Sequence, residues 1–142
     1  MEIRKLQVND YEKYLNLLEQ LTTLNKENIS KEIFEDYIEN ILNDDHITYV
    51  MIYEEELIGA GTIFFEHKVI HGMGIVGHIE DVIISNKYRS KGVGKEIMNY
   101  LVTEAENRNS YKVILNCNET NCGFYEKCGF KLKEVEMVKY FI

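Results

Sequence analysis

The segment Arg89-Ser90-Lys91-Gly92-Val93-Gly94-Lys95 decides the fold of this chain. It follows a β-branched apolar run, Val82-Ile83-Ile84, and precedes a stretch with helical spacing of apolar residues. Two glycines spaced two apart let backbone N–H groups approach an anion without a Cβ in the way, and a helix start adds unpaired N–H groups. Arg89, Lys91 and Lys95 add positive charge at the same point. The segment therefore predicts a strand-to-helix turn that binds a pyrophosphate.

The spacing in this segment differs from the better-known phosphate motifs. Walker A places four residues between its first glycine and Gly-Lys-Ser/Thr, and the dinucleotide fingerprint is G-x-G-x-x-G. The order here is Arg-x-x-Gly-x-Gly. Taken alone, the segment is equally compatible with an ordinary solvated turn, so the rest of the chain must decide.

The periodicity of apolar residues predicts alternating strands and helices on both sides of this turn. Asn9 or Asp10 caps the first predicted helix and Ser30 the second, while residues 67–77 form a loop or a wide hairpin connection. The second helix is expected to have one apolar face, formed by Ile33, Phe34, Tyr37, Ile38, Ile41 and Leu42. The predicted elements are strand 3–6, helices beginning near residues 10 and 31, strands 47–53, 57–65 and 78–85, the helix after the glycine-rich turn, strand 112–117, helix 121–128 and strand 131–140. This order predicts an α/β fold with a mixed sheet covered by helices on both faces.

Length and composition predict one domain spanning residues 1–142. A chain of 142 residues with 45% hydrophobic content buries roughly two thirds of its unfolded surface around one core. The net charge of -8 argues against nucleic-acid binding, which needs a basic face, but it allows a local basic cluster to bind an anionic ligand and would attract basic peptides. No run suits a membrane span, and Met1–Lys5 lacks the apolar stretch of a signal peptide, so we expect a cytoplasmic protein with no membrane partner.

The chain has three cysteines, Cys117, Cys122 and Cys128. Their spacings of five and six contain no Cys-x-x-Cys pair, and no nearby histidine completes a zinc site. We expect free thiols in a reducing compartment and no metal ion.

Segments distributed over nearly the whole chain resemble one protein family. They are Leu21-Thr22-Thr23, His67-Lys68-Val69-Ile70-His71-Gly72, Gly77-His78-Ile79-Glu80-Asp81-Val82, Tyr111-Lys112-Val113-Ile114-Leu115 and Phe124-Tyr125-Glu126-Lys127-Cys128-Gly129-Phe130. With the Arg-x-x-Gly-x-Gly turn, they are similar to the GCN5-related N-acetyltransferase superfamily and to its eukaryotic-type glucosamine 6-phosphate N-acetyltransferase branch. The resemblance implies a central, mostly antiparallel sheet flanked by helices on both faces.

The resemblance also implies a reaction. Enzymes of this branch transfer the acetyl group of acetyl-CoA to the 2-amino group of glucosamine 6-phosphate, a step toward UDP-N-acetylglucosamine, by direct attack in a ternary complex. The amine must arrive neutral, the developing oxyanion needs a donor, and the departing thiolate benefits from a proton. Two alternatives remain open: an acetyltransferase of a protein or peptide amine, and a non-catalytic acyl-CoA sensor.

Three residues receive catalytic roles from the resemblance. Tyr125 protonates or stabilises the departing thiolate, while its neighbour Phe124 packs in the core. Glu80 contacts the sugar and steers the amine; because side chains alternate along a strand, Asp81 should point to the opposite face. Asn116 stands where this branch commonly has an aspartate. An amide is no base, so we expect Asn116 to orient the amine through its carbonyl oxygen.

Binding residues follow from the same resemblance. The expected acetyl-CoA contacts are Asp81, Val82, Arg89, Ser90, Lys91, Gly92, Val93, Gly94, Lys95, Asn121 and Tyr125, with the backbone of Asp81 and Val82 bonding the pantetheine amides. The expected substrate contacts are Thr22, Lys68, His71, Glu80, Asn116 and Lys139. Lys139 lies near the place where family members supply a basic residue to the phosphate, although Tyr140 aligns with that position.

A homodimer is also expected. In the family, one subunit completes the substrate site of the other. The segment 135–142 is apolar enough to pair as a strand across a two-fold axis.

Overall fold

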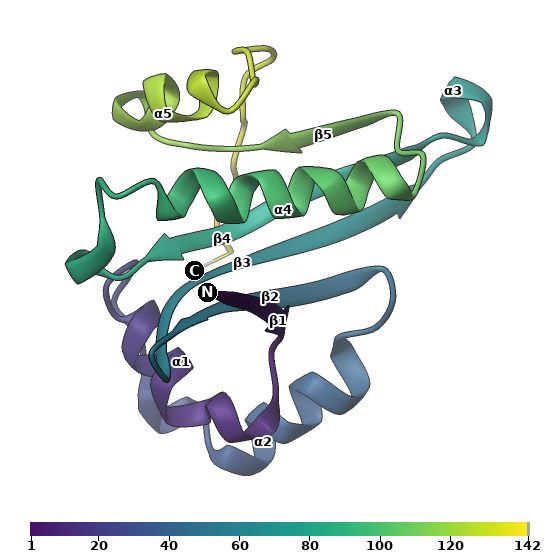
Figure 1. Cartoon of the computed structure of the whole chain (residues 1–142). Coiled ribbons are helices and arrows are strands. Elements are labelled where there is room, and N and C mark those ends of the chain that lie inside the picture. The colour runs from purple at the N-terminus through teal and green to yellow at the C-terminus, as the bar shows by residue number, and fades with distance from the viewer. Residues whose placement is uncertain (142) are drawn as a thin grey trace.

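The computed structural model of the chain describes residues 1–141, which build one five-stranded sheet with helices on both faces (Figure 1). The strands lie in sequence order: β1 (Glu2–Lys5), β2 (His46–Tyr53), β3 (Glu56–His67), β4 (Ile75–Ile84) and β5 (Lys112–Leu115). Neighbours from β1 to β4 are antiparallel, and β4 and β5 are parallel. The predicted mixed, mostly antiparallel sheet is confirmed.

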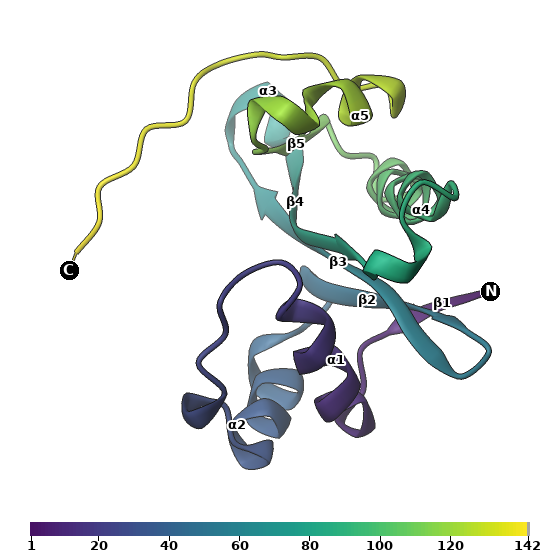
Figure 2. The same cartoon turned by 90° about the vertical axis from the view of Figure 1, so that its left-hand side faces the viewer.

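The helices divide between the two faces of this sheet (Figure 2). α4 (Val93–Asn107) and α5 (Cys122–Lys127) lie on one face; α1 (Tyr11–Leu18) and α2 (Lys31–Asp36) lie on the other. Two buried clusters result, one under α4 and one under α1 and α2. No helix within residues 1–141 is both long and apolar enough to cross a membrane.

α4 is anchored by an apolar stripe with helical spacing. Val93, Ile97, Leu101 and Ala105 are all buried against the sheet. β3 lets the helix approach closely because Gly61 has no side chain: a Cβ there would lie 2.9 Å from Cδ1 of Leu101. The start of α4, which follows the glycine-rich turn, is therefore held at a fixed place beside the sheet.

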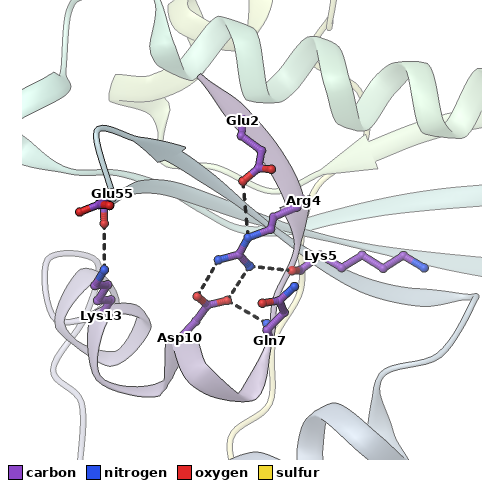
Figure 3. Close-up of polar contacts among 7 residues, drawn as sticks. All are labelled: Glu2, Arg4, Lys5, Gln7, Asp10, Lys13 and Glu55. Carbon is purple, nitrogen blue, oxygen red and sulfur yellow. Dashed lines mark hydrogen bonds and ion pairs between the residues drawn. The ribbon is translucent and has the colours of Figure 1, made fainter.

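An ion pair joins β1 to the start of α1 (Figure 3). Both guanidinium nitrogens Nη1 and Nη2 of Arg4 donate to the Asp10 carboxylate, at 2.8 and 2.9 Å, and the backbone N–H of Gln7 donates to the same group at 2.8 Å. Asp10 precedes α1, as predicted, but its side chain does not cap that helix; it is occupied by these partners. Ser30 does cap α2, accepting a hydrogen bond from the backbone N–H of Ile33.

We expect Asp10→Asn to lower the free energy of unfolding by about 2 kcal/mol at neutral pH. Burial alone would raise the pKa of the Asp10 carboxyl, but the hydrogen bonds from Arg4 and Gln7 outweigh burial and lower it. A carboxyl whose folded pKa is depressed stabilises the fold above its unfolded pKa of about 3.9, and this stabilisation is lost as the pH falls through the folded pKa. Urea unfolding at neutral and acidic pH measures the difference.

Glu2→Gln is the matched control, since Glu2 is an exposed partner of Arg4 at 3.7 Å. Exposed pairs of this kind contribute little, so this variant should unfold like the wild type. A destabilisation by Asp10→Asn that is the same at both pH values would contradict the assignment.

The predicted last strand is wrong. Residues 131–141 form no strand, and none of them makes a backbone hydrogen bond within the described part of the chain. Figure 2 shows this segment extending away from the body. Its apolar side chains are 63–93% exposed: Leu132, Val135, Met137, Val138, Tyr140 and Phe141. An extended segment needs a partner strand, and residues 1–141 offer it none. Ile142, the last residue of the predicted pairing segment, lies outside the described residues.

Two smaller predictions also change. The expected loop 67–77 is shorter, because β3 continues to His67 and β4 begins at Ile75, leaving only a turn around α3 (Ile70–Met73). The apolar face expected for the second helix is incomplete: Phe34 is buried, but Ile33 is 55% and Ile41 49% exposed. A π-helical turn, Tyr37–Ile41, changes the periodicity there.

Candidate active site

β4 separates from β5 halfway along its length, and we call this opening between the two strands the split. Their pairing ends where Ile79 lies opposite Leu115, whereas β4 remains paired with β3 as far as Ile84. From Glu80 to Ile84, the β4 edge that faces β5 therefore has no partner strand among residues 1–141. Backbone N–H and C=O groups on such an edge are available to a ligand. This is the stretch in which Asp81 and Val82 were expected to bind pantetheine.

A β-bulge lies in the same stretch. Ala60 pairs with Ile83 and Thr62 with Glu80, so two β4 residues, Asp81 and Val82, lie opposite the single residue Gly61. Asp81 has the left-handed φ of 51°. Bulges of this kind change the direction of side chains and are frequent beside active sites.

The bulge interrupts the expected alternation of Glu80 and Asp81. Burial raises the pKa of both Tyr14, on α1, and Tyr37, and the negative charge of Asp81 raises them further. Burial likewise raises the pKa of Glu80, with Asp81 as the next contribution. Ile79 is buried in the cluster under α4, so alternation along β4 places Glu80 on the α1 face, while the face taken by Asp81 at the bulge stays a prediction.

Glu80 and Asn116 correspond in register at the point where β4 and β5 part. Each is the first residue after the last paired position, Ile79 opposite Leu115. In a parallel pair, residues in register share a face, so the two side chains belong to the same face of the sheet. A carboxylate and an amide oxygen together form an acceptor pair suited to an amine.

Tyr125 lies on the α4 side of the sheet. It is half-buried on α5 and packs against the cluster under α4, with its ring 6.2 Å from that of Phe130. Burial is the main cause that raises the pKa of its phenol. The hydroxyl therefore stays protonated at neutral pH, as a proton donor must.

Phe124 is not in the core as predicted. It is 39% exposed and lies over the start of α4, where a Cβ on Gly94 would be 3.0 Å from its Cζ. This contact fixes α5, and with it Tyr125, beside the glycine-rich turn.

The turn 89–95 has the backbone geometry of an anion site. Ser90 and Gly92 have left-handed φ angles of 62° and 81°, and Gly92 is the residue before the 15-residue helix α4. No side chain within residues 1–141 caps this helix start. Its first N–H groups are free to bind an anion, and the helix dipole favours one.

Two of the three cations of the turn, Arg89 and Lys91, contact a neighbouring group. Nε of Arg89 donates to the Ile84 carbonyl at 3.2 Å, which orients its guanidinium at the end of β4. Nζ of Lys91 lies 5.6 Å from the centre of the Tyr88 ring, and Lys95 is exposed on the first turn of α4. Arg89 and Lys91 therefore precede α4, and Lys95 lies on its first turn.

Two predicted substrate residues lie at the far end of the sheet. Lys68 and His71 are in the β3–β4 connection near α3, at the end away from the start of α4 (Figure 1). The His71 ring stacks on Tyr111 at 4.1 Å, and Nζ of Lys68 lies 3.3 Å from the Glu66 carboxylate. Five residues of strand from Ile75 to Glu80 correspond to about 16 Å. Within one copy, His71 is therefore remote from Glu80, whereas the Lys68 ammonium shares the Glu66 carboxylate with His78, two residues before Glu80.

Three further predicted contacts lie outside the strands, and their roles stay predictions. Thr22 is exposed just after α1, with its N–H donating to the Leu18 carbonyl. Asn121 is exposed immediately before α5. Lys139 lies in the extended segment 131–141.

His78 received no role at the site from the sequence. It lies two residues before Glu80 on the same strand face, and its Nε2 is 3.0 Å from the Glu66 carboxylate. Its charge acts to lower the pKa of Glu80, opposing burial. The period of two along a strand is the signal that could have identified it.

Comparisons with known proteins show the family and the fold of this chain. Residues 11–130 match the acetyltransferase (GNAT) family. The chain is 37% identical over 147 residues to the Arabidopsis thaliana glucosamine 6-phosphate N-acetyltransferase, covering 99% of this chain and 96% of the relative. It is 46% identical over 102 residues to the enzyme of the same name from Schizosaccharomyces pombe, covering 68% and 92%. The crystal structure of the Arabidopsis protein superimposes with a TM-score of 0.93 at 36% identity, over 99% and 98% of the two chains.

Proposed function

The chain belongs to the acetyltransferase (GNAT) family, and on that basis we propose that it transfers the acetyl group of acetyl-CoA to the 2-amino group of D-glucosamine 6-phosphate. The product is N-acetylglucosamine 6-phosphate, a precursor of UDP-N-acetylglucosamine. The observation that carries this assignment is the 37% identity to a glucosamine 6-phosphate N-acetyltransferase over 99% of this chain. The parting of β4 from β5 gives the assignment a physical site.

Acetyl-CoA binds along the split and the glycine-rich turn in this proposal. The free β4 edge at Asp81 and Val82 bonds the pantetheine amides, and one of its N–H groups polarises the thioester carbonyl. The N–H groups at the start of α4 bind the pyrophosphate, with the three cations of the turn beside them. The cofactor runs from one end of α4 to the middle of the sheet.

Gly92→Ala should weaken acetyl-CoA binding about tenfold, because a side chain strains the left-handed backbone by roughly 1–2 kcal/mol and displaces the N–H groups at the helix start. Gly72→Ala is a matched control: Gly72 also has a positive φ, 64°, and a Cβ at either glycine would meet open space. Calorimetric titration with acetyl-CoA compares the two variants. Equal weakening in both would show that the turn does not bind the cofactor.

The chemistry uses both faces of the split. The sugar amine approaches from the α1 side, where the Glu80 carboxylate and the Asn116 carbonyl oxygen accept its protons and orient its lone pair. The thiolate that leaves the thioester carbon is met from the α4 side by the Tyr125 hydroxyl. The attacking amine and the departing thiolate are thus assisted from opposite faces of the sheet. No covalent enzyme intermediate forms.

A homodimer completes the substrate site in this proposal. Val135, Met137 and Phe141 are 86–93% exposed, and Phe64, on the α1 face of β3, is 42% exposed. A second copy covers such apolar side chains and gives the extended segment 131–141 the strand partner it lacks. Sedimentation analysis should find a dimer for the full chain and a monomer for Met137→Asp. A monomeric wild type at micromolar concentration would contradict the dimer.

The peptide alternative is tested by competition. Equal concentrations of glucosamine 6-phosphate and a lysine-containing peptide with a free N-terminus are offered with limiting acetyl-CoA. We expect the acetyl group on the sugar amine alone, identified by mass spectrometry. Acetylated peptide as the main product would replace the proposed substrate and leave the family assignment intact.

A further inference from the structure

Two cysteine thiols lie in contact beside the proposed site. The Sγ atoms of Cys117 and Cys122 are 3.8 Å apart, and the sulfur of Cys122 is also 3.9 Å from the Asn118 carbonyl oxygen. Cys117 is exposed and Cys122 half-buried. The third cysteine, Cys128, packs instead against the cluster under α4.

The contact distance is short enough for a bond to form with small movements. A disulfide needs an S–S distance of about 2.0 Å, so the two sulfurs must approach by about 1.8 Å. Cys117 lies two residues after the end of β5, and Cys122 is the first residue of α5. In the chain, only residues 118–121 separate the two cysteines, within the short connection between β5 and α5.

We propose that Cys117 and Cys122 form a reversible disulfide bond by exchange with a small-molecule disulfide such as glutathione disulfide. One cysteine thiolate attacks a sulfur of the small disulfide and releases one equivalent of its thiol. The second cysteine thiolate then attacks the mixed disulfide and releases the other. The protein loses two electrons and two protons, and the small disulfide is reduced to two thiols.

The bond joins the two segments that carry residues of the proposed site. Asn116 immediately precedes Cys117, and Tyr125 follows Cys122 by one helical turn. Burial is the main cause that raises the pKa of the Tyr125 phenol, and Cys117 lies close enough to raise it further when its thiol ionises. Displacement of catalytic groups by about 1 Å can reduce the rate a hundredfold. This consequence for activity rests on the proposed function; formation of the bond does not.

Digestion with trypsin allows a direct test, because it places Cys117 and Cys122 in a different peptide from Cys128. Cleavage after Lys112, Lys127 and Lys131 places Cys117 and Cys122 together in peptide 113–127 and Cys128 in peptide 128–131. The full chain is incubated for hours with glutathione disulfide, since burial and the neighbouring Cys122 raise the pKa of Cys117 and leave little thiolate. It is then alkylated at low pH and digested.

We expect peptide 113–127 to resist alkylation and to be lighter than the reduced peptide by two hydrogen atoms, with dithiothreitol reversing the change. Cys122→Ser should lose this product, whereas Cys128→Ser should form it as the wild type does. A stable glutathione adduct on either cysteine, or alkylation of both after oxidation, would overturn the proposal of a disulfide.

Activity is measured on the same samples. Oxidation should lower kcat by about tenfold or more in the wild type and in Cys128→Ser, and not in Cys122→Ser. If mass spectrometry shows the disulfide but kcat is unchanged, the bond does not regulate activity. If no sample acetylates glucosamine 6-phosphate before oxidation, the proposed function fails, while the mass result still decides the disulfide.

Discussion

Glu80→Gln should lower kcat/KM for glucosamine 6-phosphate by about a thousandfold, within the range expected for loss of a general base. The substitution keeps the size of the side chain but removes the negative charge beside the split. Without this charge, the ammonium form of the amine is bound less well, and its proton has no carboxylate to accept it. Thiol release, followed over a range of substrate concentrations, gives the value.

The pH profile separates this role from a structural one. Burial and the charge of Asp81 raise the pKa of Glu80. Wild-type kcat/KM should therefore fall on the acidic side through a pKa above the usual value for glutamate of about 4.3, and Glu80→Gln should lack this limb. Asp81→Asn is the control, because Asp81 acts through its backbone in this account. A loss in Glu80→Gln no larger than in Asp81→Asn would contradict the assignment.

Tyr125→Phe should lower kcat by about a hundredfold while KM for acetyl-CoA stays nearly unchanged. The ring still packs against Phe130 and the cluster under α4, so only the proton donor is lost. The raised pKa of this phenol also predicts an alkaline decline of wild-type kcat, above about pH 10, that the variant lacks.

Tyr100→Phe offers the same chemical change at another place on the α4 side. Tyr100 lies on α4 and its ring contacts Tyr49 at 4.9 Å, away from the glycine-rich turn. This control should keep the wild-type kcat. Equal losses in both variants would mean that the hydroxyl of Tyr125 supports the fold rather than the departing thiolate.

The elements with strong local patterns could be predicted from the sequence. Ile97, Leu101 and Ala105 repeat every fourth residue, which predicts α4 wherever the sheet lies. The wrong last strand had an equally apolar pattern in residues 131–140. A pattern shows that a segment is able to pair, but the partner depends on the rest of the assembly.

The parts of the site that depend on residues adjacent in the sequence could be predicted. The parts that depend on how β3 and β4 pair could not. The glycine-rich turn needs only the glycines and the start of a helix, so its geometry was expected. The bulge at Asp81 arises because β3 supplies one residue, Gly61, opposite two on β4. The distance of His71 from Glu80 follows from strand lengths that the predicted loop 67–77 underestimated. Pairing partners of this kind are not encoded locally.

The most direct test is the ratio of kcat/KM for glucosamine 6-phosphate to that for unphosphorylated glucosamine, measured by thiol release from acetyl-CoA. A phosphate held by charge-assisted hydrogen bonds should make this ratio at least about a hundred, equivalent to roughly 2.7 kcal/mol. Equal turnover of the two sugars would contradict a sugar-phosphate site. Turnover of neither, together with tight binding of acetyl-CoA, would leave the fold and the cofactor site in place and reject the substrate.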